Sequence, residues 1–142
     1  MRKELKILLN ITEQAVLGNV KNIIDHVIST ARNENLDQKK LLNIELAIEE
    51  ILVNICEYAY PDAPGAMEIT WIKEINHFII EIKDSGIPFN PLALERPDIL
   101  VPLEDRKIGG MGVLLVRNIA DDIKYERIKN QNILTLKFEQ RC

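Results

Sequence analysis

The sequence predicts an α/β (α+β) two-layer sandwich, in which a mixed, largely antiparallel sheet is covered on one face by helices. Two observations predict this class. Apolar residues switch between a period of two and a helical period along the chain, and the strand patterns come in adjacent pairs while the helical ones stand apart. A chain of 142 residues without an internal repeat is expected to form a single domain over residues 1–142.

The first part of the chain predicts one strand followed by two helices. Alternating apolar residues predict a half-buried strand over 3–11, and a stripe at helical spacing predicts a helix over 13–33. Asp37 is a suitable N-cap for a second helix that runs to about Ala59. This helix is so apolar that we expect it to be buried on more than one side. The alternating residues of the strand are Leu5, Ile7, Leu9 and Ile11.

The rest of the chain predicts two pairs of strands with one more helix between them. A Pro- and Gly-containing segment over 61–65 ends the second helix. The first strand pair is joined near Asn76, and the second at a hairpin turn on Asn130-Gln131. The expected order is therefore β-α-α-β-β-loop-α-β-β. Its later strands cover about 66–75, 77–84, 122–129 and 132–139, and its last helix covers 109–121.

Residues 87–108 form a connection that is unusually long for a compact domain, where such loops are often functional lids. Four of the six prolines and four of the six glycines lie between residues 86 and 112. A simple surface insertion is the alternative to a lid.

Composition narrows the class of protein. The chain is 46% hydrophobic and 28% charged, with a net charge of −4 and no basic block, so we expect no nucleic-acid partner. No apolar run is long enough for a membrane span, and we expect a cytoplasmic protein without a membrane partner. Cys56 lies in the second helix, where a buried free thiol is expected.

Glu50 and Asn54 are the first pair of candidate functional residues. Four residues apart on a helix, their side chains share one face of an apolar segment. A carboxylate can accept a proton from an attacking hydroxyl, and side-chain oxygens can hold Mg²⁺ together with phosphates. An ordinary exposed pair is the alternative, and Glu49 and Glu57 compete with Glu50 as the base.

Asp84 and Gly86 follow the expected strand over 77–84. A carboxylate at this strand end can accept a hydrogen bond from the amino group of adenine. Gly86 would let the backbone pass close to the base or reverse direction with a positive φ. A plain Asp-Ser-Gly turn is the alternative.

The third signal is Gly109-Gly110-Met111-Gly112, which opens the last predicted helix. Glycines that open a helix let backbone N–H groups approach an anion such as a triphosphate. Arg106 and Lys107 stand just before these glycines and could meet the terminal phosphates. A flexible hinge with solvated charges is the alternative.

With these motifs in this order, the chain resembles the GHKL (Bergerat-fold) ATPase superfamily, and within it the anti-sigma factor serine-protein kinases. The resemblance covers about residues 5–139. It rests on Glu50-Ile-Leu-Val-Asn54, on Asp84-Ser-Gly86-Ile-Pro88-Phe89-Asn90-Pro91 and on Gly109-Gly110-Met111-Gly112-Val113.

The resemblance implies a kinase that transfers phosphate from ATP to a serine of a small antagonist (anti-anti-sigma) protein and also sequesters a sigma factor, as a homodimer. Glu50 would be the general base and Asn54 the Mg²⁺ ligand. ATP contacts would come from Asn54 and from a further set of residues over the strand end and the lid. That set is Asp84, Gly86, Arg106, Lys107, Gly110, Met111 and Gly112.

Two residues depart from the family pattern. Tyr58 stands where many members have histidine, and Pro88 stands where the larger ATPases have glycine. These departures affect the expected lid and ribose contacts. A module that uses ATP only to order its lid and gate a protein interface, without catalysis, is the alternative function.

Overall fold

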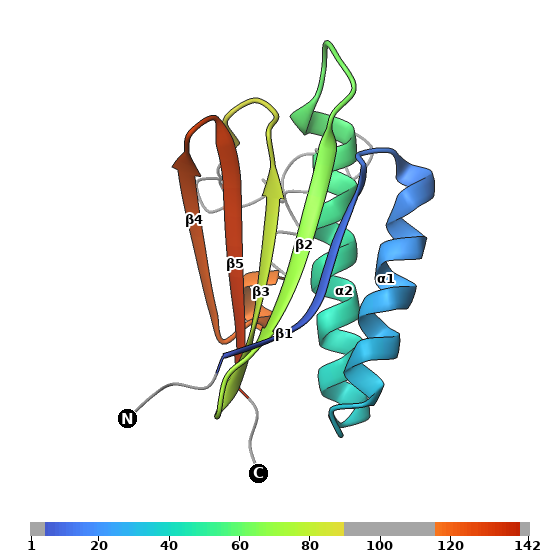
Figure 1. The fold of residues 1–142 in the computed structure, drawn as a ribbon, viewed down its shortest axis with the longest axis vertical. Coiled ribbons are helices and arrows are strands. Elements are labelled where there is room, and N and C mark those ends of the chain that lie inside the picture. The colour runs from blue at the N-terminus through green and yellow to red at the C-terminus, as the bar shows by residue number, and fades with distance from the viewer. Residues whose placement is uncertain (1–4, 90–115, 140–142) are drawn as a thin grey trace, which may run out of the picture.

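The computed structural model describes residues 5–89 and 116–139, which form a sheet and two long helices beside it (Figure 1). No helix in these ranges is long and apolar enough to cross a membrane. The strands are β1 (Lys6–Gln14), β2 (Ala66–Lys73), β3 (His77–Asp84), β4 (Asp122–Ile128) and β5 (Gln131–Glu139). The helices are α1 (Leu17–Arg32), α2 (Gln38–Asn54) and the π-helical turn η1 (Ile55–Ala59).

The five-stranded sheet has the order β1-β2-β3-β5-β4, and all four strand pairings are antiparallel. Helices α1 and α2 lie side by side on the same side of the sheet (Figure 1). The expected α+β sandwich and the order of the described elements are thereby confirmed. The part of the sheet that the structure describes contains no parallel pair, so it is antiparallel throughout rather than mixed.

Alternating residues of the central strands make the core, because successive side chains of a strand point to opposite faces. Trp71 on β2, Phe78 on β3 and Phe138 on β5 are fully buried. The Trp71 and Phe78 rings meet edge to face with 5.4 Å between their centroids. Helix α1 adds its predicted stripe, of which Ile23 and Val27 are buried.

Strand β1 covers Lys6–Gln14, three residues later at each end than the predicted 3–11, and its side chains do not all face as predicted. Ile7 is 66% exposed, although it was expected to share a buried face with Leu9. The ladder with β2 shifts between these two residues, so that Ile7 pairs with Ile72 on the outer face and Leu9 pairs with the buried Trp71. This β-bulge reverses the side-chain alternation, which a simple period of two does not anticipate.

Helix α2 begins as predicted, since the Asp37 side chain accepts a hydrogen bond from Lys40 N (2.7 Å). The expectation that it is buried on more than one side is wrong for its first half, where Leu42 is 54% exposed and Leu46 36% exposed. The Cys56 thiol is only partly buried and lies 3.9 Å from Met67 Sδ.

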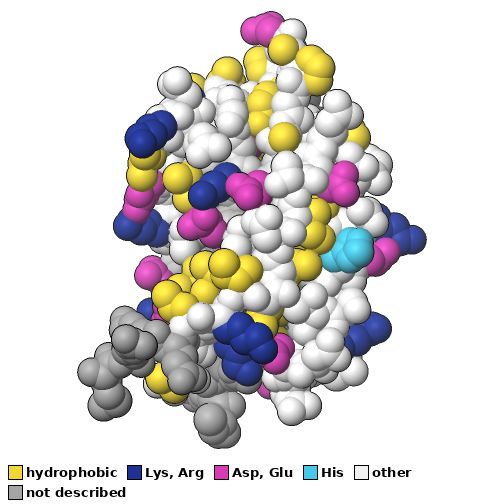
Figure 2. All heavy atoms as spheres, in the orientation of Figure 1, with side chains coloured by type: hydrophobic (Ala, Val, Ile, Leu, Met, Phe, Trp, Pro, Cys, Tyr) yellow, Lys and Arg dark blue, Asp and Glu magenta, His cyan; other side chains and the backbone are white. Residues whose placement is uncertain are grey.

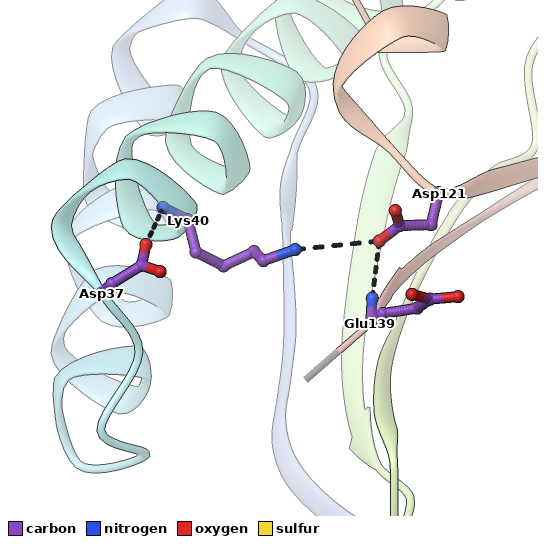
Figure 3. A network of polar contacts seen from close by, with 4 residues as sticks. All are labelled: Asp37, Lys40, Asp121 and Glu139. Carbon is purple, nitrogen blue, oxygen red and sulfur yellow. Dashed lines mark hydrogen bonds and ion pairs between the residues drawn. The ribbon is translucent and has the colours of Figure 1, made fainter. Parts of the chain in front are cut away.

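A polar network joins the start of α2 to the start of β4 (Figure 3). Lys40 Nζ lies 3.7 Å from Asp121 Oδ2, which also accepts a hydrogen bond from Glu139 N (2.6 Å). Residues 116–119 are helical and lead into Asp121, consistent with the end of the helix expected over 109–121. The network therefore ties the helical layer to the last two strands.

The hairpin between β4 and β5 turns one residue earlier than predicted. Ile128 pairs with Gln131, which leaves Lys129 and Asn130 as a two-residue loop. Both have positive φ, 49° and 64°, as a type I′ turn requires. The prediction placed the turn on Asn130-Gln131, and a positive φ at a lysine such as Lys129 is uncommon, so its residue type does not indicate the turn.

Figure 2 shows one face of the molecule, on which hydrophobic side chains gather apart from a group of charged side chains of both signs. Exposed apolar residues of the described chain include Leu5, Ile7 and Ile75. Of these, Ile7 lies on strand β1, whereas Leu5 precedes β1 and Ile75 lies in the turn between β2 and β3.

Candidate functional site

The C-terminal end of α2 places the first candidate pair on one face, as predicted. Asn54 is buried, and its Nδ2 donates a hydrogen bond to Oε1 of the half-buried Glu50 (3.2 Å). This bond uses the amide nitrogen and not the carboxamide oxygen, which is an acceptor that can serve another ligand. This arrangement differs from the alternative of a fully exposed pair.

The environment of Glu50 makes its carboxylate more basic. Burial raises the pKa of Glu50 above the ordinary value of 4.5, and the charges of Glu49 and Glu57 raise it further, while the Asn54 hydrogen bond opposes the change. A carboxylate with a raised pKa holds an abstracted proton more firmly, which suits a general base. Glu49 and Glu57 are both exposed.

Asp84 ends β3 and is buried, with 7% of its surface exposed. Its Oδ1 accepts hydrogen bonds from Gly86 N (2.9 Å) and from Asn132 Nδ2 (2.8 Å). Burial raises the pKa of Asp84 above its ordinary value of 3.8, against the opposing effect of these hydrogen bonds and of the Arg127 charge. The two bonds fix the orientation of a carboxylate that borders a pocket.

Gly86 is required by a close contact with the helix end. A Cβ at this position would lie 2.2 Å from the carbonyl oxygen of Ala59, closer than any real side chain allows. Ile87 N donates to that same oxygen at 2.8 Å. Gly86 does not have the left-handed φ that was one expectation, so its role comes from this backbone approach.

Asn132 is a site residue that the sequence reasoning missed. Its Nδ2 bonds Asp84 and also the carbonyl oxygen of Ile87 (2.8 Å). Its Oδ1 accepts from the Tyr125 hydroxyl (2.6 Å) and from Phe89 N (3.2 Å). A signal was present, since Asn132 is a polar residue on the face of β5 that is otherwise apolar, and buried polar groups need partners.

Two more residues that were not predicted hold the Asp84 turn from outside. Arg127 Nη1 donates to the carbonyl oxygen of Gly86 (2.8 Å). The Tyr60 hydroxyl, just after η1, accepts from Ser85 N at 2.7 Å. The turn is therefore held by both sheet and helix layers.

A small pocket brings the two predicted groups together, because Asn54 and Asp84 both line it. Its enclosed space is about 30 Å³, which is enough for water but too small for a purine base. Phe89, Tyr125 and Asn132 border it on other sides. Its remaining walls are apolar and come from α2, η1, β3 and β5: Ile51, Ile55, Ile82 and Leu134. An apolar pocket with a few fixed polar groups is typical of a small-molecule site.

The other predicted site residues lie outside the described residues. They are Arg106, Lys107, Gly110, Met111 and Gly112, together with most of the expected lid over 87–108. Their roles remain predictions from the sequence.

Comparison with known proteins agrees with this geometry. The histidine kinase-like ATPase domain matches residues 14–138. The serine-protein kinase RsbW of Bacillus thuringiensis (strain Al Hakam) is 29% identical over 103 residues, which cover 70% of this chain and 64% of that relative. The serine/threonine-protein kinase BtrW of Bordetella bronchiseptica is 30% identical over 94 residues, covering 66% of each chain.

The match to the first of these kinases thus spans less than two thirds of its length. The predicted resemblance to the GHKL ATPases and their anti-sigma factor kinases is confirmed at the level of family, since the domain match covers every described element except β1, of which it includes only Gln14, and the last residue of β5. The chain belongs to the histidine kinase-like ATPase family.

Proposed function

We propose that this protein is an ATP-dependent serine-protein kinase that acts as an anti-sigma regulatory factor. The observation that carries the proposal is the pocket lined by both Asn54 and Asp84, with Glu50 bonded to Asn54 at its margin. These groups come from distant parts of the sequence, and the fold gathers them at one end of the α2–sheet interface. The names of the similar kinases support transfer of phosphate to serine.

Asp84 is the residue proposed to recognise the adenine base. The bonds from Gly86 and Asn132 both end on Oδ1, which leaves Oδ2 to accept from the 6-amino group of adenine. The apolar walls of the pocket suit the apolar faces of a purine. The Asp84 turn is held on several sides, so little ordering is needed when the base binds.

Purine binding requires the pocket to widen from its present volume of about 30 Å³. Phe89 is the residue best placed to move, because it is only half-buried and begins the segment expected to form the lid. Movement of its ring alone keeps the bond from Phe89 N to Asn132 (3.2 Å), and a movement that includes the backbone would break this long bond but not the shorter one from Tyr125. Asp84 would keep its support.

Asn54 is the proposed Mg²⁺ ligand. Mg²⁺ takes oxygen ligands, commonly one or two from the protein with the rest from water and phosphates, and the carboxamide oxygen of Asn54, which lines the pocket, can be one of them. When bound, Mg²⁺ would neutralise charge on the phosphates. The Glu50 hydrogen bond holds the carboxamide so that its oxygen, not its nitrogen, meets the ion.

Glu50 is the proposed general base. The substrate serine hydroxyl attacks the γ-phosphorus, its proton passes to the Glu50 carboxylate, and the bond from the γ-phosphorus to the bridging oxygen breaks to release ADP. The raised pKa of Glu50 favours acceptance of that proton. Arg106 and Lys107 are proposed to approach the terminal phosphates, and Gly110, Met111 and Gly112 to close on them.

The proposed partners follow from the resemblance: a sigma factor, a small antagonist protein that receives the phosphate, and a second copy of this chain. A homodimer needs an apolar contact surface. The exposed Ile7, which pairs with Ile72 on the outer face of the sheet, supports such a surface there.

Labelled ATP tests the proposal directly. The protein is incubated with γ-labelled ATP, Mg²⁺ and candidate small antagonist proteins, each also prepared with its candidate serine changed to alanine. We expect label on the wild-type antagonist only. Tight ATP binding without any phosphate transfer would favour the alternative function, a module that binds ATP to gate a protein interface. No ATP binding would refute both functions.

A further inference from the structure

We propose that Tyr60 is a positioning residue for base recognition, which holds the Asp84–Gly86 turn in the orientation that reads adenine. The inference rests on the proposed function. The Tyr60 hydroxyl joins three segments: it belongs to the residue after η1, accepts from Ser85 N at 2.7 Å, and donates to the carbonyl oxygen of Ala66 at the start of β2. One hydroxyl therefore connects the helix end, the Asp84 turn and the neighbouring strand.

The bond to Ser85 controls the peptide that leaves Asp84. Three successive amide groups after Asp84 have acceptors: Ser85 N on Tyr60, Gly86 N on Asp84 itself, and Ile87 N on Ala59. Of these three bonds, only the one from Ser85 N ends on a side chain outside the turn, the Tyr60 hydroxyl. Loss of the hydroxyl would free the peptide adjoining Asp84, and the carboxylate would then rotate more freely relative to the bound base.

We expect the Tyr60 hydroxyl to contribute little to the stability of the fold, so that a positioning role can be distinguished from a purely structural one. Ser85 and Ala66 are both exposed, so water can hydrogen-bond the released amide and carbonyl, which keeps the cost to folding small but does not hold the Ser85 peptide in place. The aromatic ring contributes the packing, because it covers Gly65, where a Cβ would lie 1.9 Å from the Tyr60 ring. The ring and the hydroxyl can therefore be tested separately.

The first test is Tyr60→Phe, which keeps the ring and removes the hydroxyl. Binding of ATP and of inosine triphosphate, whose 6-oxo group offers Asp84 no donor, is measured by calorimetry, with thermal unfolding in parallel. We expect a melting temperature close to wild type, about 2- to 10-fold weaker ATP binding, and a smaller ATP-to-inosine-triphosphate affinity ratio. A purely structural role would lower the melting temperature and leave that ratio unchanged.

The second test displaces the ring without altering the hydroxyl. In Gly65→Ala the new methyl group must displace the Tyr60 ring, which carries the hydroxyl bonded to Ser85 N, so the same loss of base discrimination is expected. Gly18→Ala is the matched control, since a Cβ at Gly18 would have no neighbour within 4 Å. We expect this control to keep the wild-type ratio.

The outcomes separate this inference from the proposed function. If wild-type protein binds neither triphosphate, or binds both equally, the proposed adenine site is wrong and this inference fails with it. If wild-type protein prefers ATP and both Tyr60→Phe and Gly65→Ala keep the full preference, the adenine site stands and only the role of Tyr60 is overturned.

Discussion

Glu49 and Glu50 are neighbours in sequence with different surroundings, which makes one a control for the other. Glu49 is exposed, whereas Glu50 is half-buried and bonded to Asn54. Loss of a general base typically costs 10²- to 10⁴-fold in rate, so we expect about that reduction in phosphoryl transfer for Glu50→Gln, with ATP affinity nearly unchanged. Glu49→Gln should transfer phosphate at close to the wild-type rate. If Glu49→Gln lost activity and Glu50→Gln kept it, the general base would be Glu49.

The pH dependence of the reaction follows from the same residue. Glu50 must be ionised to accept a proton, and its pKa in the folded protein lies above the ordinary 4.5. We therefore expect the single-turnover rate to fall as the pH is lowered through this raised pKa, at a higher pH than for an ordinary glutamate. ATP binding measured at each pH separates this loss from weaker binding. A rate that holds constant down to pH 4.5 would contradict the assignment.

Asp84→Asn should separate stability from nucleotide binding. The pKa of Asp84 is raised in the folded state, so the stability linked to its neutral form is present below 3.8 and is lost as the pH rises through the folded pKa. Near neutral pH the ionised group is therefore a cost, and the unliganded variant should melt no lower than wild type. Its ATP affinity should fall about 10-fold or more, because a charged acceptor is lost. If ATP raised the melting temperature of Asp84→Asn as much as that of wild type, the assignment of Asp84 to adenine recognition would be wrong.

At the scale of the element, the start of α2 offers a paired test (Figure 3). The Asp37 side chain caps the helix through Lys40 N, and Asp37→Ala should lower the free energy of unfolding by about 1 kcal/mol. Lys40→Met keeps the capped backbone group and removes only the exposed ion pair with Asp121, so it should cost less. Urea unfolding compares the two variants. A larger loss for Lys40→Met would show that the ion pair, not the cap, stabilises this end.

The elements could be predicted where one local rule decided the structure. The cap at Asp37 and the limits of β3 follow from residue preference and alternation, and both agree with the structure. The bulge after Ile7 could not be predicted, because the pairing partner Ile72 decides which face is outward. The turn at Lys129-Asn130 was displaced for a similar reason, since the register with β5 overrides residue preference.

The candidate site was predictable to the same limited extent. Spacing on a helix brought Glu50 and Asn54 together correctly, because a single element sets their geometry. Asn132 contacts Asp84 from 48 residues away in the chain, and only the pairing of β3 with β5 creates that contact. Tyr60 was missed because its partner is a backbone amide, which carries no residue-specific signal.

At the scale of the whole molecule, ligand binding and self-association should both be measurable. ATP at 100 times its dissociation constant stabilises a folded protein by roughly 2.7 kcal/mol, which thermal unfolding can detect. For the proposed homodimer, Ile7→Glu places a charge on the exposed outer face of the sheet. We expect wild-type protein to sediment as a dimer and this variant as a monomer.

The control for association is Leu42→Glu, which changes a similarly exposed apolar residue, 54% exposed, on helix α2. It should sediment as the wild type does. If Ile7→Glu also remains dimeric, the contact surface lies elsewhere on the molecule. If Leu42→Glu alone becomes monomeric, the contact involves the helical layer.

The π-helical turn η1 has one further consequence. Such a turn accommodates one more residue than regular α-helix over the same rise, and it ends with the Ala59 oxygen that receives Ile87 N. Because the wide turn absorbs this extra residue, deleting one residue between 55 and 59 would return the segment to regular α-helical winding while the chain after it keeps its direction. Ile55 and Ala59 are both buried, so the deletion would also change the packing at this end of the core. A change of chain length here would therefore show whether the width of the turn, rather than any side chain, sets the position of the Ala59 oxygen that meets Ile87 N.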